Sequence, residues 1–249
     1  MCFDTDSAPP IRAIAGAAVS HDQLTLTAAD GNSFRAFAAA PDEPTTSGVV
    51  IFPDVRGLYR FYEELALRFA ERALAAIAFD YYGRTAGASS RDDDFDYAPH
   101  RDQTTDDAIQ ADAHSAVERL RERGVESVVS VGFCFGGRAS WVAAASGHGL
   151  VGSVGFYGSP TRRRGGPSVI ERVEEIGCPI LALQAGDDAG ITAEDNDEFE
   201  RALTEHGVEH EIVVYDGAPH SFFDRKQDEF AESSDDAWRR VLAFIDTHT

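Results

Sequence analysis

The chain has 249 residues, of which 43% are hydrophobic, and its 43 acidic residues outnumber 22 basic ones to give a formal net charge of −21. Such a charge repels nucleic-acid phosphates and anionic lipid heads, and no apolar run reaches the ~18 residues of a membrane span. We therefore expect neither a nucleic acid nor a membrane as partner, and we expect a cytoplasmic protein because the acidic N-terminal segment is unlike a signal peptide.

The basic residues are unusual in kind, since Lys226 is the only lysine and the others are arginines. An acidic surface keeps a protein soluble where salt screens charge strongly, which suggests a halophilic source as a hypothesis. A GC-rich genome that replaces lysine with arginine is the alternative. Equal stability of the folded state at low and at molar salt would contradict the halophilic interpretation.

The first predicted elements form a hairpin. Residues 1–22 are expected to be irregular, and the alternating segments 23–29 and 34–40 flank Asp30-Gly31, which favours an antiparallel turn. Further along, apolar runs predict strands and amphipathic runs predict helices. The strands are expected at residues 49–52, 76–79, 128–132, 151–156, 180–183 and 212–215, and the helices at residues 59–74, 104–123, 138–145, 192–205 and 230–245.

This alternation predicts an α/β fold over residues 1–249 as a single domain, with a mainly parallel sheet, helices on both faces and the N-terminal antiparallel hairpin. Residues 85–103 form the longest polar interruption, either a lid or a plain surface loop. The run Arg162-Arg163-Arg164 could hold an anion, but its Gly/Pro-rich setting favours an exposed loop.

The pattern Gly132-x-Cys134-x-Gly136 lies between a predicted strand and a predicted helix. It is typical of a nucleophile elbow with cysteine in place of serine, in which glycines give the reactive side chain room on a strained turn. A helix N-terminus behind the thiol also favours a thiolate or an oxyanion. The alternative is a glycine-rich turn with a buried structural cysteine. Of the other cysteines, Cys2 and Cys178, neither forms a Cys-x-x-Cys pair.

Two more candidates follow strands. Asp188 comes after residues 180–183 and His220 after residues 212–215, so the chain order is nucleophile, acid, histidine. Each alone is more often a turn former or a structural residue, but the ordered set predicts a Cys134–His220–Asp188 triad, with Asp187 as the rival acid. The backbone N–H groups of Phe135 and Val55 are the expected oxyanion donors.

The chain resembles the dienelactone hydrolase family of α/β-hydrolases over nearly its whole length. The elbow is the most specific element, and residues 53–58, 80–84 and 220–222 match in place. The resemblance implies hydrolysis of an enol-lactone through a thioester acyl-enzyme, without metal or organic cofactor. It also marks Asp54, where the family has a glutamate that pairs with the thiol, as either a thiol modulator or an orienting residue of its loop.

The same resemblance implies a substrate carboxylate held by arginines, for which Arg101 and Arg225 lie near the expected positions, and it includes Tyr82 among the residues that bind substrate or modulate the nucleophile. The expected partner is thus a small ester or lactone, and the expected state is a monomer or small homo-oligomer. A general esterase or thioesterase and a non-catalytic scaffold remain alternatives. A glutamine amidotransferase-type enzyme is disfavoured because no His-x-Glu pair follows the cysteine, and the histidines form no zinc motif.

Overall fold

The computed structural model describes residues 7–91, 94–164, 166–223 and 229–249. One sheet of eight strands crosses the molecule in the order β1-β2-β4-β3-β5-β6-β7-β8. The pairs β1–β2 and β2–β4 are antiparallel, and all later neighbours are parallel. The strands are β1 (Val19–Thr27), β2 (Ser33–Pro41), β3 (Ser47–Phe52), β4 (Ala75–Phe79), β5 (Ser127–Phe133), β6 (Gly152–Phe156), β7 (Ile180–Asp187) and β8 (His210–Pro219).

The N-terminal hairpin forms where its turn chemistry predicts it. Gly31 has a φ of +86°, and the side chain of Asp30 accepts a hydrogen bond from the N–H of Asn32 at 3.1 Å. The mainly parallel sheet and this antiparallel hairpin confirm the predicted fold class. The prediction that residues 1–22 are irregular is wrong at its end, because β1 already begins at Val19, where it pairs with Pro41.

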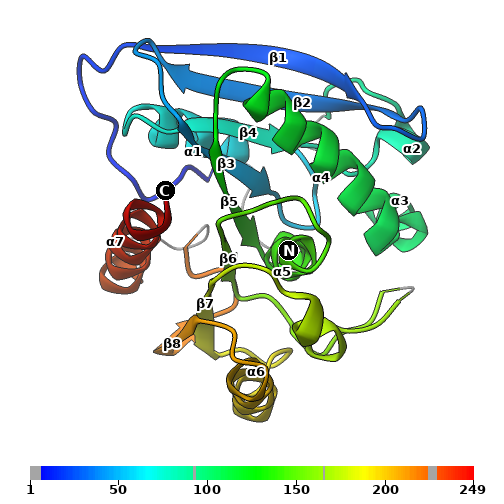
Figure 1. Cartoon of the computed structure of the whole chain (residues 1–249), viewed down its shortest axis with the longest axis vertical. Coiled ribbons are helices and arrows are strands. Elements are labelled where there is room, and N and C mark those ends of the chain that lie inside the picture. The colour runs from blue at the N-terminus through cyan, green and yellow to red at the C-terminus, as the bar shows by residue number, and fades with distance from the viewer. Residues whose placement is uncertain (1–6, 92–93, 165, 224–228) are drawn as a thin grey trace.

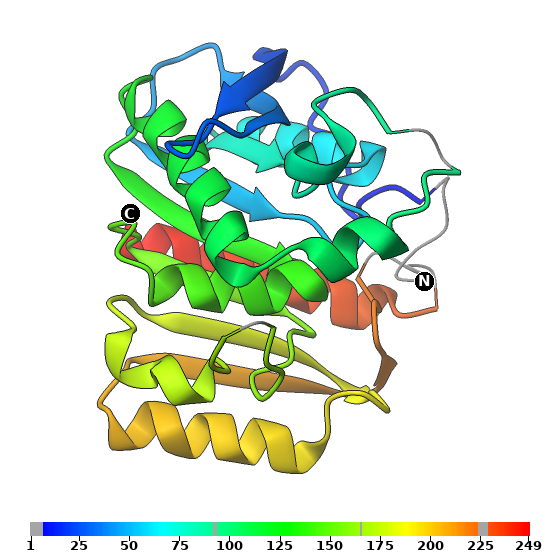
Figure 2. The ribbon, with the colours of Figure 1, turned by 90° about the vertical axis from the view of Figure 1, so that its right-hand side faces the viewer.

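Helices cover both faces of the sheet (Figures 1 and 2). On one face lie α1 (Arg60–Ala70) and α7 (Ala231–His248), and on the other lie α4 (Asp106–Arg121), α5 (Phe135–Ala144) and α6 (Ala193–Glu205). Burial on both faces of the sheet explains why residues 49–52 of β3 are all apolar. Val49 and Ile51 enter the core beneath α1 and α7, whereas Val50 and Phe52 enter the core beneath α4 and α5.

Two of these helices begin at the predicted caps. The side chain of Thr105 accepts a hydrogen bond from the N–H of Ala108 at 3.3 Å at the start of α4. Thr192 and Asp195 form a capping box at the start of α6, in which each side chain bonds the other residue's backbone N–H. Both helices therefore start where their polar first residues satisfy the N–H groups that have no partner within the helix.

Some boundaries differ from the prediction. Helix α1 ends at Ala70, four residues before the predicted end, and Ala73 takes a left-handed φ of +62° that no continuing helix allows. The polar segment 85–103 contains the end of α2 (Gly83–Ala86) and all of α3 (Ala98–Gln103), and the turn η1 (Ile170–Glu175) was not predicted. Among the described helices, none has both the length and the apolar character needed to cross a membrane.

Candidate active site

Cys134 lies on a tight turn between β5 and α5. It has a φ of +56°, a backbone conformation that residues other than glycine rarely adopt. Its N–H donates to the carbonyl of Phe156 at 3.0 Å. A Cβ atom on Gly132 would lie 2.0 Å from the carbonyl oxygen of Gly136, and a Cβ on Gly136 would lie 2.1 Å from that of Phe52. Only glycine fits at the positions two residues before and two residues after the cysteine, which is the physical reason for the Gly-x-Cys-x-Gly pattern.

His220 and Asp188 meet at the ends of the last two strands. Nδ1 of His220 and Oδ2 of Asp188 are 2.5 Å apart, and Oδ1 of Asp188 accepts a hydrogen bond from the N–H of Gly190 at 2.8 Å. Burial acts to raise the pKa of Asp188, but the hydrogen bond and charge of His220 outweigh it, so that this pKa lies below its ordinary value. Asp187, the rival acid, is exposed at the end of β7.

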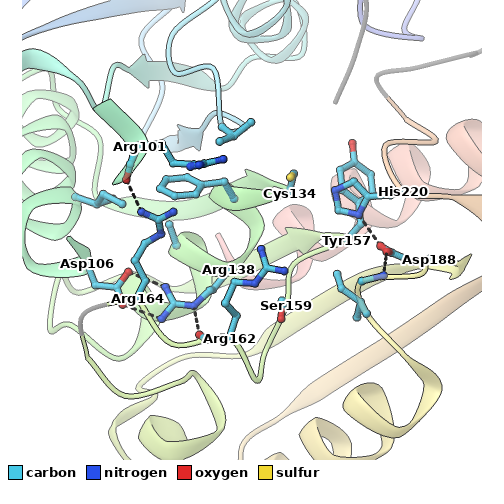
Figure 3. A pocket seen from close by; sticks show the side chains of 16 residues that line it. Arg101, Asp106, Cys134, Arg138, Tyr157, Ser159, Arg162, Arg164, Asp188 and His220 are labelled. Atoms are coloured by element: carbon cyan, nitrogen blue, oxygen red, sulfur yellow. Dashed lines mark hydrogen bonds and ion pairs between the residues drawn. The ribbon is translucent and has the colours of Figure 1, made fainter. Parts of the chain in front are cut away.

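Cys134, Asp188 and His220 line one cavity of about 360 Å³. In Figure 3 the ring of His220 lies between the thiol of Cys134 and the carboxylate of Asp188, while arginines gather at the opposite end. The structure thus brings the three predicted triad residues to one cavity wall. The wall is formed by Val55, Arg101, Asp106, Ile109, Cys134, Phe135, Arg138, Ala139, Tyr157, Ser159, Arg162, Arg164, Asp188, Gly190, Ile191 and His220.

Both residues predicted to supply oxyanion donors lie beside the cysteine in this wall. Phe135 is the first residue of α5, and Val55 belongs to the loop that follows β3. The close packing of Gly136 against the end of β3 brings this loop and the elbow together. The backbone N–H groups of a helix start and of an adjacent loop are suitable donors to a negatively charged oxygen.

The far end of the cavity carries several guanidinium groups. Arg138 makes two hydrogen bonds of 2.7 Å to the carboxylate of Asp106, and its Nε donates to the carbonyl of Arg162 at 2.7 Å. Arg164 donates to the carbonyl oxygens of Arg101 and Thr104 at 2.6 and 3.1 Å. The charge of Arg138 is matched by Asp106 and that of Arg101 by Asp102, whereas Arg162 and Arg164 add positive charge to the cavity of a strongly acidic protein.

The guanidinium of Arg164 also lies 4.4 Å from the centre of the Phe135 ring. Burial lowers its pKa, but an arginine keeps its charge at neutral pH. The prediction of an exposed arginine loop holds for Arg163, which pairs with Glu171 at the surface. It holds as well for Arg162, which is exposed while it also lines the cavity, and it is wrong for Arg164, which is half-buried in the cavity wall.

The other predicted site residues lie in different places. Arg101 lines the cavity from α3, where its guanidinium also contacts Asp102. Asp54 and Tyr82 are buried behind the cavity wall: Oδ1 of Asp54 accepts a hydrogen bond from the N–H of Arg56 at 2.8 Å, and the hydroxyl of Tyr82 donates to the carbonyl of Val55. Arg225 lies outside the described residues.

Tyr157 is a site residue that the sequence reasoning missed. It follows β6, has a φ of +36°, and its ring centre lies 5.0 Å from that of His220. Cys134 and Ser221, directly after His220, also have positive φ values, so three of the four such non-glycine residues described lie at this site. Strained backbone gathers at functional sites. The one available signal was the position of Tyr157 at the carboxyl end of a parallel strand.

The fold and this site together define the class of protein. A mainly parallel eight-stranded sheet with a nucleophile-type elbow after β5, an acid after β7 and a histidine after β8 is the arrangement of an α/β-hydrolase. Within the described residues, no group of three His, Cys, Asp or Glu side chains is placed to hold a metal ion.

Comparison with known proteins gives the family. The dienelactone hydrolase family profile matches residues 34–249, and the chain belongs to this family. A protein of Saccharolobus solfataricus named "Putative carboxymethylenebutenolidase" is 28% identical, with 87% of this chain and 95% of that protein covered. An Escherichia coli K12 protein of the same name is 29% identical over 89% of this chain and 85% of its own length. The protein is therefore a hydrolase of ester bonds.

Solved structures agree in fold. The "Putative Dienelactone Hydrolase" of Klebsiella pneumoniae superposes with a TM-score of 0.80 at 23% identity and covers 92% of this chain and 98% of its own. A dienelactone hydrolase-like promiscuous phosphotriesterase from metagenomic libraries gives a TM-score of 0.76 at 20% identity over 93% and 99% of the two chains. At these identities the likeness establishes the fold alone.

Proposed function

We propose that this protein is a cysteine-dependent hydrolase of a small lactone or ester that carries a carboxylate, acting through Cys134, His220 and Asp188. One observation carries the proposal: the thiol on its strained turn shares a cavity with a histidine whose Nδ1 is 2.5 Å from a buried carboxylate. That contact fixes the ring so that Nε2 is the nitrogen available for proton transfer.

In the proposed acylation step, Nε2 of His220 accepts the thiol proton of Cys134 while the sulfur attacks the carbonyl carbon of the ester. The carbonyl π electrons move to the oxygen, whose negative charge is stabilised by the N–H groups of Val55 and Phe135. When the carbonyl re-forms, the carbon–oxygen bond to the leaving group breaks, and that oxygen takes the proton from His220. The product is a thioester of Cys134, and in a lactone the leaving oxygen stays attached to the acyl chain.

In the proposed deacylation step, His220 removes a proton from a water molecule as the water oxygen attacks the thioester carbonyl. The second tetrahedral intermediate then expels the sulfur of Cys134, which regains its proton from the imidazolium. Asp188 stabilises that imidazolium in both steps, which suits the lowered pKa of its carboxyl group. The net reaction adds one water molecule across the ester bond.

The substrate carboxylate is assigned to the arginine end of the cavity. Arg101, Arg162 and Arg164 line that end, and arginine binds carboxylates through paired N–H donors. The relatives named carboxymethylenebutenolidase support a substrate in which a carboxymethylene group accompanies the lactone. We assign Asp54 to the orientation of its loop, because its Oδ1 already accepts the Arg56 N–H at 2.8 Å.

The test is steady-state hydrolysis of cis- and trans-dienelactone, p-nitrophenyl acetate and a simple acyl thioester at low and at high salt. We expect the dienelactones to be turned over fastest, and Cys134→Ala to lower kcat by at least about a thousandfold. Cys178→Ala is the matched control, because burial raises the pKa of that thiol to about 12 and it lies beneath α5 and α6.

Full activity of Cys134→Ala would overturn the mechanism. Turnover of p-nitrophenyl acetate alone, lost in Cys134→Ala, would keep the triad and identify a general esterase. Turnover of the thioester alone would identify a thioesterase. If none of the substrates were hydrolysed and Cys134 did not react with iodoacetamide, a non-catalytic scaffold would be favoured.

A further inference from the structure

Three consecutive residues after β4 bind the loop that carries Val55. The hydroxyl of Tyr81 donates to the carbonyl of Pro53 at 2.6 Å, and the hydroxyl of Tyr82 donates to the carbonyl of Val55. Oδ1 of Asp80 accepts a hydrogen bond from the N–H of Leu58 at 3.1 Å. All three side chains are buried, so these bonds are shielded from competing water.

The two tyrosine bonds fall on either side of one peptide group. The N–H of Val55 belongs to the peptide between Asp54 and Val55, and the carbonyls bound by the tyrosines belong to the peptides immediately before and after it. The carbonyl of the central peptide accepts a hydrogen bond from the N–H of Gly57 at 3.0 Å. Because a trans peptide directs its N–H opposite to its C=O, the direction of the Val55 N–H is set by these neighbours.

Asp80 connects this arrangement to the polar segment that follows. Its Oδ2 accepts hydrogen bonds from the N–H of Tyr82 at 3.1 Å and from Arg91 at 2.8 Å. The side chains of Arg91 and Asp80 are 5% and 1% exposed. Gly57 completes the fit, because with its φ of +81° a Cβ there would lie 2.4 Å from Oδ1 of Asp80.

We propose that Tyr81 and Tyr82 are positioning residues for the oxyanion site, which hold the Val55 N–H aimed at the reacting carbonyl through the two adjacent peptide groups. This inference rests on the proposed function and adds residues that do not themselves touch the substrate. A donor fixed before the reaction needs no reorganisation as charge develops on the oxygen, which is what makes such donors effective.

The chemistry of the two side chains suits this role. Burial raises the pKa of both tyrosines, and the charges of Asp80 and Asp54 raise it further, so both hydroxyls stay protonated donors throughout the working pH range. Phenylalanine has the same shape without the hydroxyl. The substitutions Tyr81→Phe and Tyr82→Phe therefore remove one donor each and keep the packing of the ring.

The test compares two reactions of Cys134 in each variant. Acylation by p-nitrophenyl acetate, followed in the pre-steady state, develops negative charge on a carbonyl oxygen. Alkylation by iodoacetamide, followed by mass spectrometry of the peptide containing Cys134, needs the same sulfur but develops no such charge. We expect Tyr82→Phe to slow acylation by about tenfold or more, and to leave the alkylation rate within about twofold of wild type.

Tyr215→Phe is the matched control, because the hydroxyl of Tyr215, on β8, donates to Asp236 of α7 at 3.0 Å and not to the Val55 loop. Its loss should leave both rates unchanged. An equal fall of acylation and alkylation in Tyr82→Phe, or an unchanged acylation rate in both tyrosine variants, would overturn the inference. A failure of the proposed function is distinguishable, since it would appear as activity retained by Cys134→Ala.

Discussion

The two ends of the cavity are built from different kinds of chain segment. Cys134, Asp188 and His220 each come directly after a strand of the central sheet, so their positions follow from the parallel register of β5, β7 and β8. Arg101 lies on a short helix, where its side chain contacts Asp102, and Arg164 lies on a loop after β6, where it is held by the carbonyl groups of Arg101 and Thr104. The reacting end is thus fixed by the sheet, and the arginine end by a few side-chain hydrogen bonds.

The largest expected effect tests the reacting end. Asp188→Asn keeps the size of the side chain but removes the charge that orients and stabilises the His220 ring. We expect kcat to fall by about a thousandfold or more, with little change in KM, because the loss is felt in the transition state. Asp187→Asn is the matched control, since Asp187 is exposed one residue earlier. Equal losses in the two variants would contradict the assignment of Asp188.

The second effect concerns the support of the arginine end. Gln110 donates to the carbonyl of Ala139, next to Arg138, and its Oε1 is 3.0 Å from Nε2 of buried His148. Burial, with smaller effects of His114 and Arg121, lowers the pKa of His148 to about 4. Since an unfolded histidine has a pKa of about 6.5, the unfolded chain binds the additional proton between these pH values and the folded chain does not.

Acid therefore favours the unfolded state over this range. We expect the free energy of unfolding, measured by urea denaturation, to fall by up to about 3 kcal/mol as the pH falls from about 6.5 to about 4. His148→Gln should flatten this dependence, whereas His206→Gln, at an exposed histidine, should leave it intact. An unchanged pH dependence in His148→Gln would show that other groups cause the loss.

The smallest effect would sharpen the contrast between the two ends. Arg164→Met removes the charge from the cavity wall but keeps an unbranched chain beside Phe135. We expect KM for a carboxylate-bearing lactone to rise by about tenfold with kcat nearly unchanged, and the kinetics of p-nitrophenyl acetate to stay as in wild type. Arg163→Met, at the exposed neighbour paired with Glu171, is the control. Equal losses for charged and neutral esters would show that Arg164 supports the fold of the wall rather than the substrate anion.

The same difference between the two ends explains what the sequence could predict. Apolar runs mark strands, and residues placed directly after a parallel strand reach one edge of the sheet, so Cys134, Asp188 and His220 could be predicted to gather there. Arg164 had no such signal. Its place depends on hydrogen bonds to the carbonyls of Arg101 and Thr104, which are about 60 residues away in sequence. No local pattern records a contact of that kind.

Two other differences between the prediction and the structure also have causes that lie outside the local sequence. Tyr82 was predicted from the family resemblance to touch substrate or modulate the nucleophile, but its hydroxyl is directed at the backbone of the Val55 loop. The early start of β1 at Val19 depends on pairing with Pro41 across the hairpin, and pairing extends a strand beyond the alternation that its own residues display. In each case a partner distant in sequence decides the outcome.

The glycines of the elbow have a consequence for changing the substrate range of this protein. Because a methyl group at Gly136 would collide with the carbonyl of Phe52, and one at Gly132 with the carbonyl of Gly136, the reacting end cannot be reshaped from these two positions. Mutant libraries for new ester substrates should leave Gly132, Cys134 and Gly136 unchanged. They should be concentrated on Ser159, Arg162 and Arg164, whose side chains line the cavity from the loop after β6.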